Sequence, residues 1–196
     1  LQRPGATSGS KFVVRIDADW VTLTNLTIEA TAPTPVGRLV VLEDAENITV
    51  RNCTLNGHLL PGSDEGTLIW SGAPEDASGF VLNQSTLTQG YTGLDLILSN
   101  TDPGPDTLTV VDNTFTHQEA GGVSALVDDG ISVSLASEEP DGLIQGNTFE
   151  TNTSSWFLYR AINVFGGGSW VEGNDILMGS GAYGIGVENA NGSVVV

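Results

Sequence analysis

The sequence contains very little cysteine, little positive charge and no long apolar runs. Cys53 is its single cysteine, which excludes a disulfide framework and a cysteine-based metal site. No run reaches 18 apolar residues, so the sequence predicts no membrane span. His58 and His117 lie far apart and make no recognised metal-ligand spacing, so the sequence predicts no metal site.

Basic residues are outnumbered by acidic ones, 6 against 24, which gives a formal net charge of −18. A field of this sign repels phosphate backbones and therefore excludes nucleic acid as a partner. We interpret the charge as a solvated acidic coat of the kind that a salt-rich habitat favours. No cofactor is predicted. Ca²⁺ is the alternative, because acidic turns offer carboxylate oxygens, but none of these turns matches a defined calcium loop.

One phrase recurs six times along the chain, at intervals of 27 to 34 residues. Each copy begins with an apolar residue and ends with a polar residue followed by an apolar one. Just before that ending lies a pair of residues that usually includes Asn. The copies are Val21–Ile28, Ile48–Leu55, Phe80–Leu87, Leu108–Phe115, Leu143–Phe149 and Trp170–Ile176. A self-similar period of this length signals a solenoid.

A second short apolar strand accompanies each repeat, with turn-forming residues between the two strands. These strands are expected at Leu39–Leu42, Leu68–Trp70, Leu94–Leu98, Ile131–Leu135, Ile162–Phe165 and Ile185–Val187. No segment shows a 3.6-residue apolar stripe, so helices are not expected. We predict an all-β fold, a right-handed parallel β-helix of about six to seven coils. Residues 1–196 are expected to form a single domain or segment of it.

Stacking the copies produces two columns of side chains. The first is expected to point inward beside a turn, where Asn amides can bond along the axis. It contains Leu26, Cys53, Ser85, Asn113, Asn147 and Asn174. The second is expected to face solvent as a ladder of mostly β-branched residues. It contains Thr27, Thr54, Thr86, Thr114, Thr148 and Asp175.

Phrases such as Asn47–Leu55 and Gly146–Phe149 resemble the repeats of the pectate-lyase-like superfamily of right-handed parallel β-helix proteins. The resemblance covers about residues 12–196. It is specific for fold and not for chemistry, because the superfamily contains lyases, hydrolases, phage tailspikes and passive surface stalks. We expect the protein to act outside the cell or at the cell surface.

Both ends of the sequence read as open coils without a capping helix. Lys11–Ile16 is already a strand, and Ser193–Val196 begins a further one. Natural solenoids normally cover such edges. We therefore expect either a segment of a longer protein or a subunit that stacks end to end with copies of itself.

Aligning the strands that precede the repeats predicts a groove along the first strand of each coil. The column at the strand entrance is expected to contain Arg38, Gly66, Thr92, Asp129, Arg160 and Tyr183. The outward column beside it is expected to contain Val41, Ile69, Asp95, Ser132, Asn163 and Gly186. Candidate catalytic residues in this groove are Asp129, Arg160, Asp95 and Tyr183. Candidate substrate-binding residues are Asp128, Asn163 and Trp156, the last of them offering a ring on which a sugar can stack.

The catalytic patterns of the superfamily are mostly missing. The resemblance implies that a lyase needs cations around its uronate substrate, yet Arg160 is the only basic residue in the second half of the chain. Asp128-Asp129 resembles one of the acidic motifs of polygalacturonase-type hydrolases, but Thr92 stands where an aspartate would complete the pair. A salt bridge between coils is the competing interpretation of Asp129 and Arg160. The leading hypothesis is a non-catalytic structural or glycan-interacting β-helix, and the alternative is a polysaccharide lyase or glycoside hydrolase.

Overall fold

The chain is described by a computed structural model, and the fold is all-β as predicted. The described residues form 21 strands and contain no α-helix. They are residues 2–3, 12–30, 38–57, 66–71, 77–90, 92–98, 107–117, 129–135, 141–151, 160–166, 169–177, 183–188 and 194–195.

The strands make three parallel sheets of seven strands each within the described residues. The first sheet contains β2 (Phe12–Ile16), β5 (Arg38–Leu42), β8 (Ile69–Ser71), β11 (Leu94–Leu98), β14 (Asp129–Leu135), β17 (Arg160–Gly166) and β20 (Tyr183–Glu188). The second contains β3 (Thr22–Thr24), β6 (Thr49–Arg51), β9 (Phe80–Asn83), β12 (Thr107–Val111), β15 (Asp141–Gln145), β18 (Ser169–Glu172) and β21 (Val194–Val195). The third contains β1 (Gln2–Arg3), β4 (Thr27–Ala30), β7 (Thr54–Asn56), β10 (Thr86–Thr88), β13 (Thr114–His117), β16 (Thr148–Thr151) and β19 (Asp175–Leu177).

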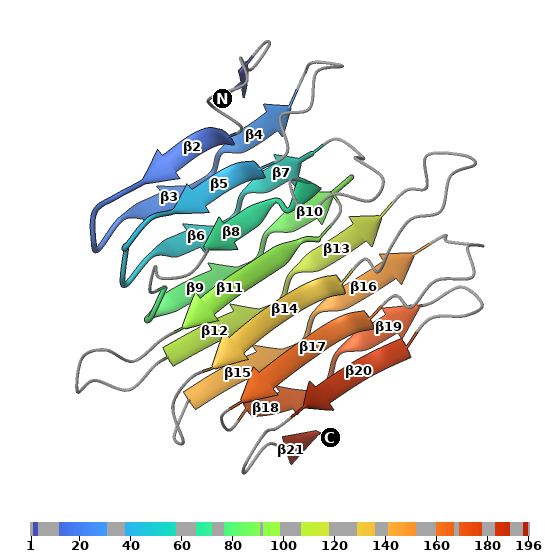
Figure 1. Cartoon of the computed structure of the whole chain (residues 1–196). Coiled ribbons are helices and arrows are strands. Elements are labelled where there is room, and N and C mark those ends of the chain that lie inside the picture. The colour runs from blue at the N-terminus through green and yellow to red at the C-terminus, as the bar shows by residue number, and fades with distance from the viewer. Residues whose placement is uncertain are drawn as a thin grey trace.

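The chain winds through the sheets in a fixed order. It passes from the first sheet to the second and then to the third before the next coil begins, so each strand pairs with the strand one coil away. In Figure 1 the first sheet lies nearest the viewer and its strands run to the left, whereas the strands of the third sheet behind it run to the right as the coils descend. This winding is right-handed, as parallel crossover connections require. The fold is a parallel β-helix.

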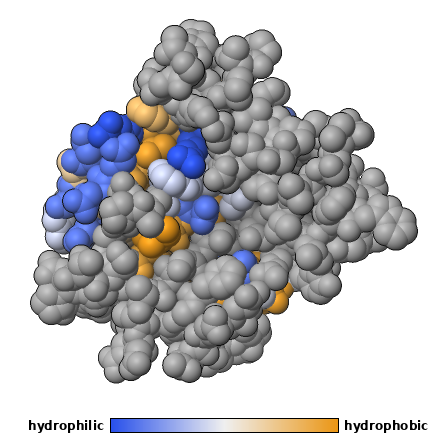
Figure 2. All heavy atoms as spheres, in the orientation of Figure 1, coloured by the Kyte–Doolittle hydropathy of each residue, from blue (hydrophilic) through white to orange (hydrophobic). Residues whose placement is uncertain are grey.

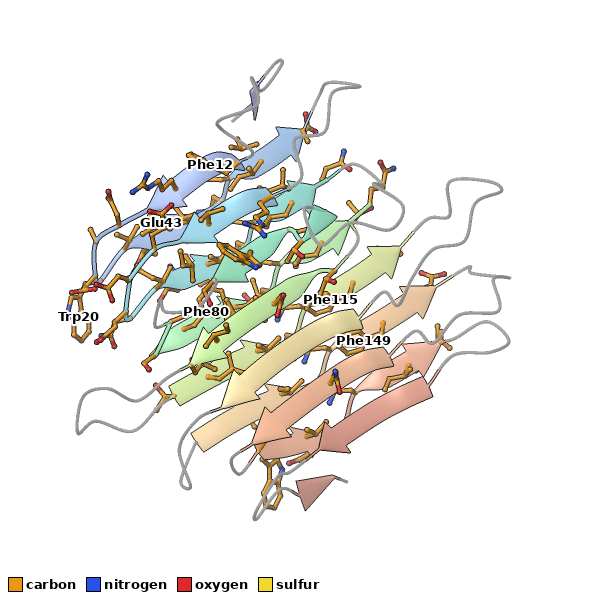
Figure 3. The ribbon with its side chains drawn as sticks, viewed as in Figure 1. Phe12, Trp20, Glu43, Phe80, Phe115 and Phe149 are labelled. Atoms are coloured by element: carbon orange, nitrogen blue, oxygen red, sulfur yellow. The ribbon has the colours of Figure 1, made fainter. Side chains whose placement is uncertain are left out.

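The inward side chains of the three sheets share one apolar core. Along the third sheet, Leu87 is in register with Phe115 and Phe115 with Phe149. The rings of Phe115 and Phe149, labelled in Figure 3, stack with centroids 4.8 Å apart and planes 8° from parallel. Both side chains are fully buried. The core therefore contains a stacked aromatic pair that links two neighbouring coils.

The corner between the second and third sheets has the same two-residue form in all six described coils. The first residue always has a positive φ; these residues are Asn25, Asn52, Gln84, Asp112, Gly146 and Gly173. Asn, Asp and Gly tolerate this left-handed conformation better than other residues, which explains why the repeat is rich in them. The second residue belongs to the inward column predicted from the sequence.

The predicted ladder of amides is confirmed. Asn147 Nδ2 donates to the Val110 carbonyl at 2.8 Å and to Asn174 Oδ1 at 2.9 Å. Asn147 Oδ1 accepts from the backbone N–H of Asn113 at 2.9 Å and from its Nδ2 at 3.0 Å. Ser85 and Cys53 continue the same column, where Ser85 Oγ accepts from the Cys53 N–H at 3.1 Å. Because these polar groups are buried, satisfying them fixes the corners of successive coils to one another.

Trp20 is an exception at another corner, the one before the second sheet. It has a φ of 61°, and the equivalent positions of the next two coils are Asn47 and Gly79, which also have positive φ. Its indole projects outward in Figure 3 and is 78% exposed. A bulky residue in the left-handed region is strained, and little burial compensates for the strain here.

We expect Trp20→Asn to raise the unfolding free energy by about 1 kcal/mol, because Asn accepts the left-handed conformation and little packing is lost. For a chain of this size, that corresponds to a Tm increase of roughly 2–4 °C. Trp20→Ala is the control, since alanine removes the indole and keeps the strain. Thermal unfolding followed by circular dichroism compares the two. Equal Tm values for both variants would show that backbone strain is not the cause.

Candidate functional site

The first sheet brings three of the predicted catalytic residues into one column. Asp129 of β14 is in register with Arg160 of β17, and Arg160 is in register with Tyr183 of β20. Neighbouring strands are separated by about 4.8 Å, so the three backbone positions lie on successive coils. Only the backbone of these residues is described. Asp128 and Trp156 lie outside the described residues.

Asp95, the fourth predicted catalytic residue, lies in a different column. It is in register with Ser132 on one side and with Trp70 on the other. Ser132 is in turn in register with Asn163. Asp129 precedes Ser132 by three residues, which is about 10 Å along the strand. The structure therefore divides the predicted site between two columns.

The expected neighbour of Asp95 was wrong by one residue. Ile69, not Trp70, was placed in the outward column, but Ile69 is in register with Leu94 and is fully buried. The β5 and β8 strands are apolar on both faces, so their sequences carry no alternation from which the register can be read. The pairing is also locally irregular, because the N–H groups of Leu39 and Val40 both donate to the Leu68 carbonyl, at 3.0 and 2.8 Å.

The shift gives this column an aromatic side chain that the sequence did not predict there. Trp70 is half-buried, and the guanidinium carbon of Arg38 lies 3.4 Å from the centre of its ring. Such a cation–π contact holds both groups in place. The indole of Trp70, the half-buried carboxylate of Asp95 and the guanidinium of Arg38 therefore occupy neighbouring coils of one face.

The outer side of the first sheet is partly covered. Val41, beside Trp70 in the column, is 4% exposed, and Asn163 is 3% exposed. Figure 2 views the molecule from this side and shows apolar surface next to polar surface in its described part. A ligand on this face therefore meets Trp70 and Asp95 more readily than it meets Asn163.

The outer face of the second sheet is different, because its described side chains from β3 to β18 are all exposed or half-buried. Two columns of side chains run along it, and none of their twelve members from β3 to β18 is buried. The first column contains Thr22, Thr49, Val81, Thr109, Leu143 and Trp170. The second contains Thr24, Arg51, Asn83, Val111, Gln145 and Glu172.

Leu143 and Trp170 were expected at the apolar opening position of the repeat, equivalent to Phe80 and Leu108. The register instead places Gly142 and Ser169 in that inward position, one residue earlier. The reason is that the last two copies of the phrase are one residue shorter in the sequence alignment. Leu143 and Trp170 therefore lie on the outer face, where Trp170 is 46% exposed.

Metal and membrane features are not found in the described part of the chain. No group of three or more His, Cys, Asp or Glu side chains is placed there to hold a metal ion. The same residues contain no helix that could span a membrane. Comparison with protein-family models, curated proteins and solved structures gave no match. The chain is therefore classified by its parallel β-solenoid fold.

Proposed function

We propose that this protein is a non-catalytic β-helix of the cell exterior that binds a glycan on the outer side of its first sheet. The observation that carries the proposal is the adjacency of Trp70 and Asp95 on neighbouring coils, with Arg38 stacked on the indole. Aromatic rings stack on the apolar faces of sugars, and carboxylates accept hydrogen bonds from sugar hydroxyls. Arg38 occupies one face of the indole, so the sugar would stack on the opposite face. Val41 and Asn163 of the same column are buried, so the proposed contact is with the sugar units above Trp70 and Asp95.

A binding role is favoured over hydrolysis by the spacing of the candidate carboxylates. Asp129 lies one coil beyond Asp95 and three residues earlier in the strand. That offset separates their Cα positions by about 11 Å, and because three residues is an odd step along a strand, the two positions belong to opposite faces of the sheet, unlike the paired carboxyl groups that glycosidases hold roughly 5–9.5 Å apart. The alternative, a polysaccharide lyase or glycoside hydrolase, rests on the register of Asp129, Arg160 and Tyr183.

We expect Trp70→Ala to weaken glycan binding about tenfold, because the variant loses the stacking ring. Asp95→Asn is expected to weaken binding less, since the amide still accepts a hydrogen bond. The measurement is affinity electrophoresis in gels containing a panel of soluble neutral and acidic polysaccharides. Trp70→Phe should restore part of the binding, and Thr86→Ala, on the exposed face of the third sheet, is the control.

Two results of that experiment would contradict the proposal. One is unchanged binding by Trp70→Ala when its circular dichroism spectrum equals that of the parent. The other is release of unsaturated products or reducing ends from any polysaccharide in the panel by the purified protein. The second result would support the enzyme alternative, and abolition of turnover by Arg160→Ala would then assign the activity to the entrance column.

A further inference from the structure

Trp170 is held in an unusual way for an exposed aromatic residue. Its Nε1–H donates to the carboxylate of Glu172, two residues further along β18 on the same outer face. Residues two apart in a strand are about 6.7 Å apart, so this bond draws the indole along the strand. The ring therefore lies over the sheet surface between two columns, and its polar edge is already satisfied.

The surroundings of Trp170 combine apolar and polar residues: Leu143 and Val194 are its neighbours in register, and Glu172 lies in the next column. On the preceding coil, Leu143 is in register with Trp170 and Gln145 with Glu172. Among the twelve side chains of the two columns, the charged ones are Arg51 and Glu172, which lie four coils apart. The chain as a whole carries −18. These two columns are therefore sparsely charged within a strongly acidic protein, and Glu172 is their charged member beside Trp170.

The exposed indole and its polar neighbours favour a sugar over a polyanion or an apolar partner. A polyanion is repelled by the charge of the whole chain. A purely apolar partner would bury Glu172 and Gln145 without replacing their hydrogen bonds to water. A sugar ring avoids both problems, because it stacks its C–H face on an indole while its hydroxyls donate to a carboxylate and pair with an amide.

We propose that Trp170, Glu172 and Gln145 form a second carbohydrate subsite, for a neutral pyranose unit, on the outer face of the second sheet. The indole supplies the stacking platform, Glu172 fixes its orientation and accepts from a sugar hydroxyl, and Gln145 donates and accepts beside it. The subsite shares no residue with the face that contains Trp70. Its test is therefore independent of the test of the function proposed above.

The test uses the intact chain and a panel of three neutral polysaccharides, galactomannan, xyloglucan and arabinoxylan, with polygalacturonate as the acidic comparison. Trp170→Ala should lose about tenfold or more of its affinity for at least one neutral polymer, and Trp170→Phe should retain part of it. Glu172→Ala should weaken binding because the indole loses its anchor, whereas Glu172→Gln keeps an acceptor and should bind better than Glu172→Ala. Trp20→Asn is the control for removing an exposed tryptophan elsewhere.

The outcomes separate the two faces. Loss of binding in Trp170→Ala but not in Trp70→Ala supports the second-sheet subsite and contradicts the first-sheet site. The reverse pattern overturns the subsite and leaves the first-sheet site standing. Binding of polygalacturonate alone, or of no polymer in the panel, overturns the subsite. Equal affinities of Glu172→Ala and Glu172→Gln would overturn the anchoring role of Glu172.

Discussion

Replacing Phe149 with alanine is expected to lower the unfolding free energy by about 3–5 kcal/mol, the largest effect of any single change considered. The side chain is fully buried, so its removal leaves a cavity, and it also breaks the stack with Phe115. Urea unfolding followed by circular dichroism measures the change. The control is Leu177→Ala on the next coil, where the side chain is 53% exposed and the expected loss is within about 0.5 kcal/mol. Similar midpoints for the two variants would contradict the stacked core.

Asn147→Leu is expected to lose about 3 kcal/mol although it keeps the volume of the side chain. The leucine cannot accept from the Asn113 N–H or donate to the Val110 carbonyl, and each buried group left unpaired costs about 1–3 kcal/mol. Asn147→Ser is the comparison, because Ser85 already serves as an acceptor in the same column. We expect the serine variant to lose clearly less stability in urea unfolding. Equal losses would contradict this expectation, and a larger loss in the serine variant would show that volume, and not hydrogen bonding, decides the stability of the corner.

The sequence predicts best the parts of the fold that repeat chemically as well as structurally. Asn113, Asn147 and Asn174 could be placed beside one another because each follows a residue suited to positive φ and precedes a polar–apolar pair. The same corner in the first coils contains Leu26 and Cys53, and these could be assigned only because the flanking residues repeat. At this corner the backbone preference of the first residue and the burial of the second both repeat from coil to coil, so the sequence pattern predicts the structure.

The outer faces were harder to predict. Strand alternation reveals which side chains face outward only where one face is polar, and β5 and β8 are apolar on both faces. Ile69 was therefore placed in the outward column that Trp70 occupies. Trp170 was misplaced for a related reason, because the small residues Gly142 and Ser169 fill the inward position that other coils give to large apolar residues. A polar residue two positions after an aromatic one, Glu172 after Trp170, was the signal that could have identified an outward-facing ring.

The candidate site illustrates a second limit. Repeats predict which backbone positions are neighbours, and the register of Asp129 with Arg160 and Tyr183 was predicted correctly. They do not predict accessibility, which depends on segments that differ from coil to coil. Asn163 was expected to contact a substrate, yet the structure buries it.

The invariant two-residue corner also determines where this molecule can accept new sequence. One residue inserted between Gly146 and Asn147 would shift β16 by one position, so the side chains of that strand would exchange inside for outside. The other connections already vary in length, since the repeats recur at intervals of 27 to 34 residues while the corner stays constant. Peptides inserted into those connections would leave the strand pairing of the second and third sheets unchanged. The connections of variable length can therefore accept inserted residues, whereas the two-residue corner must keep its length.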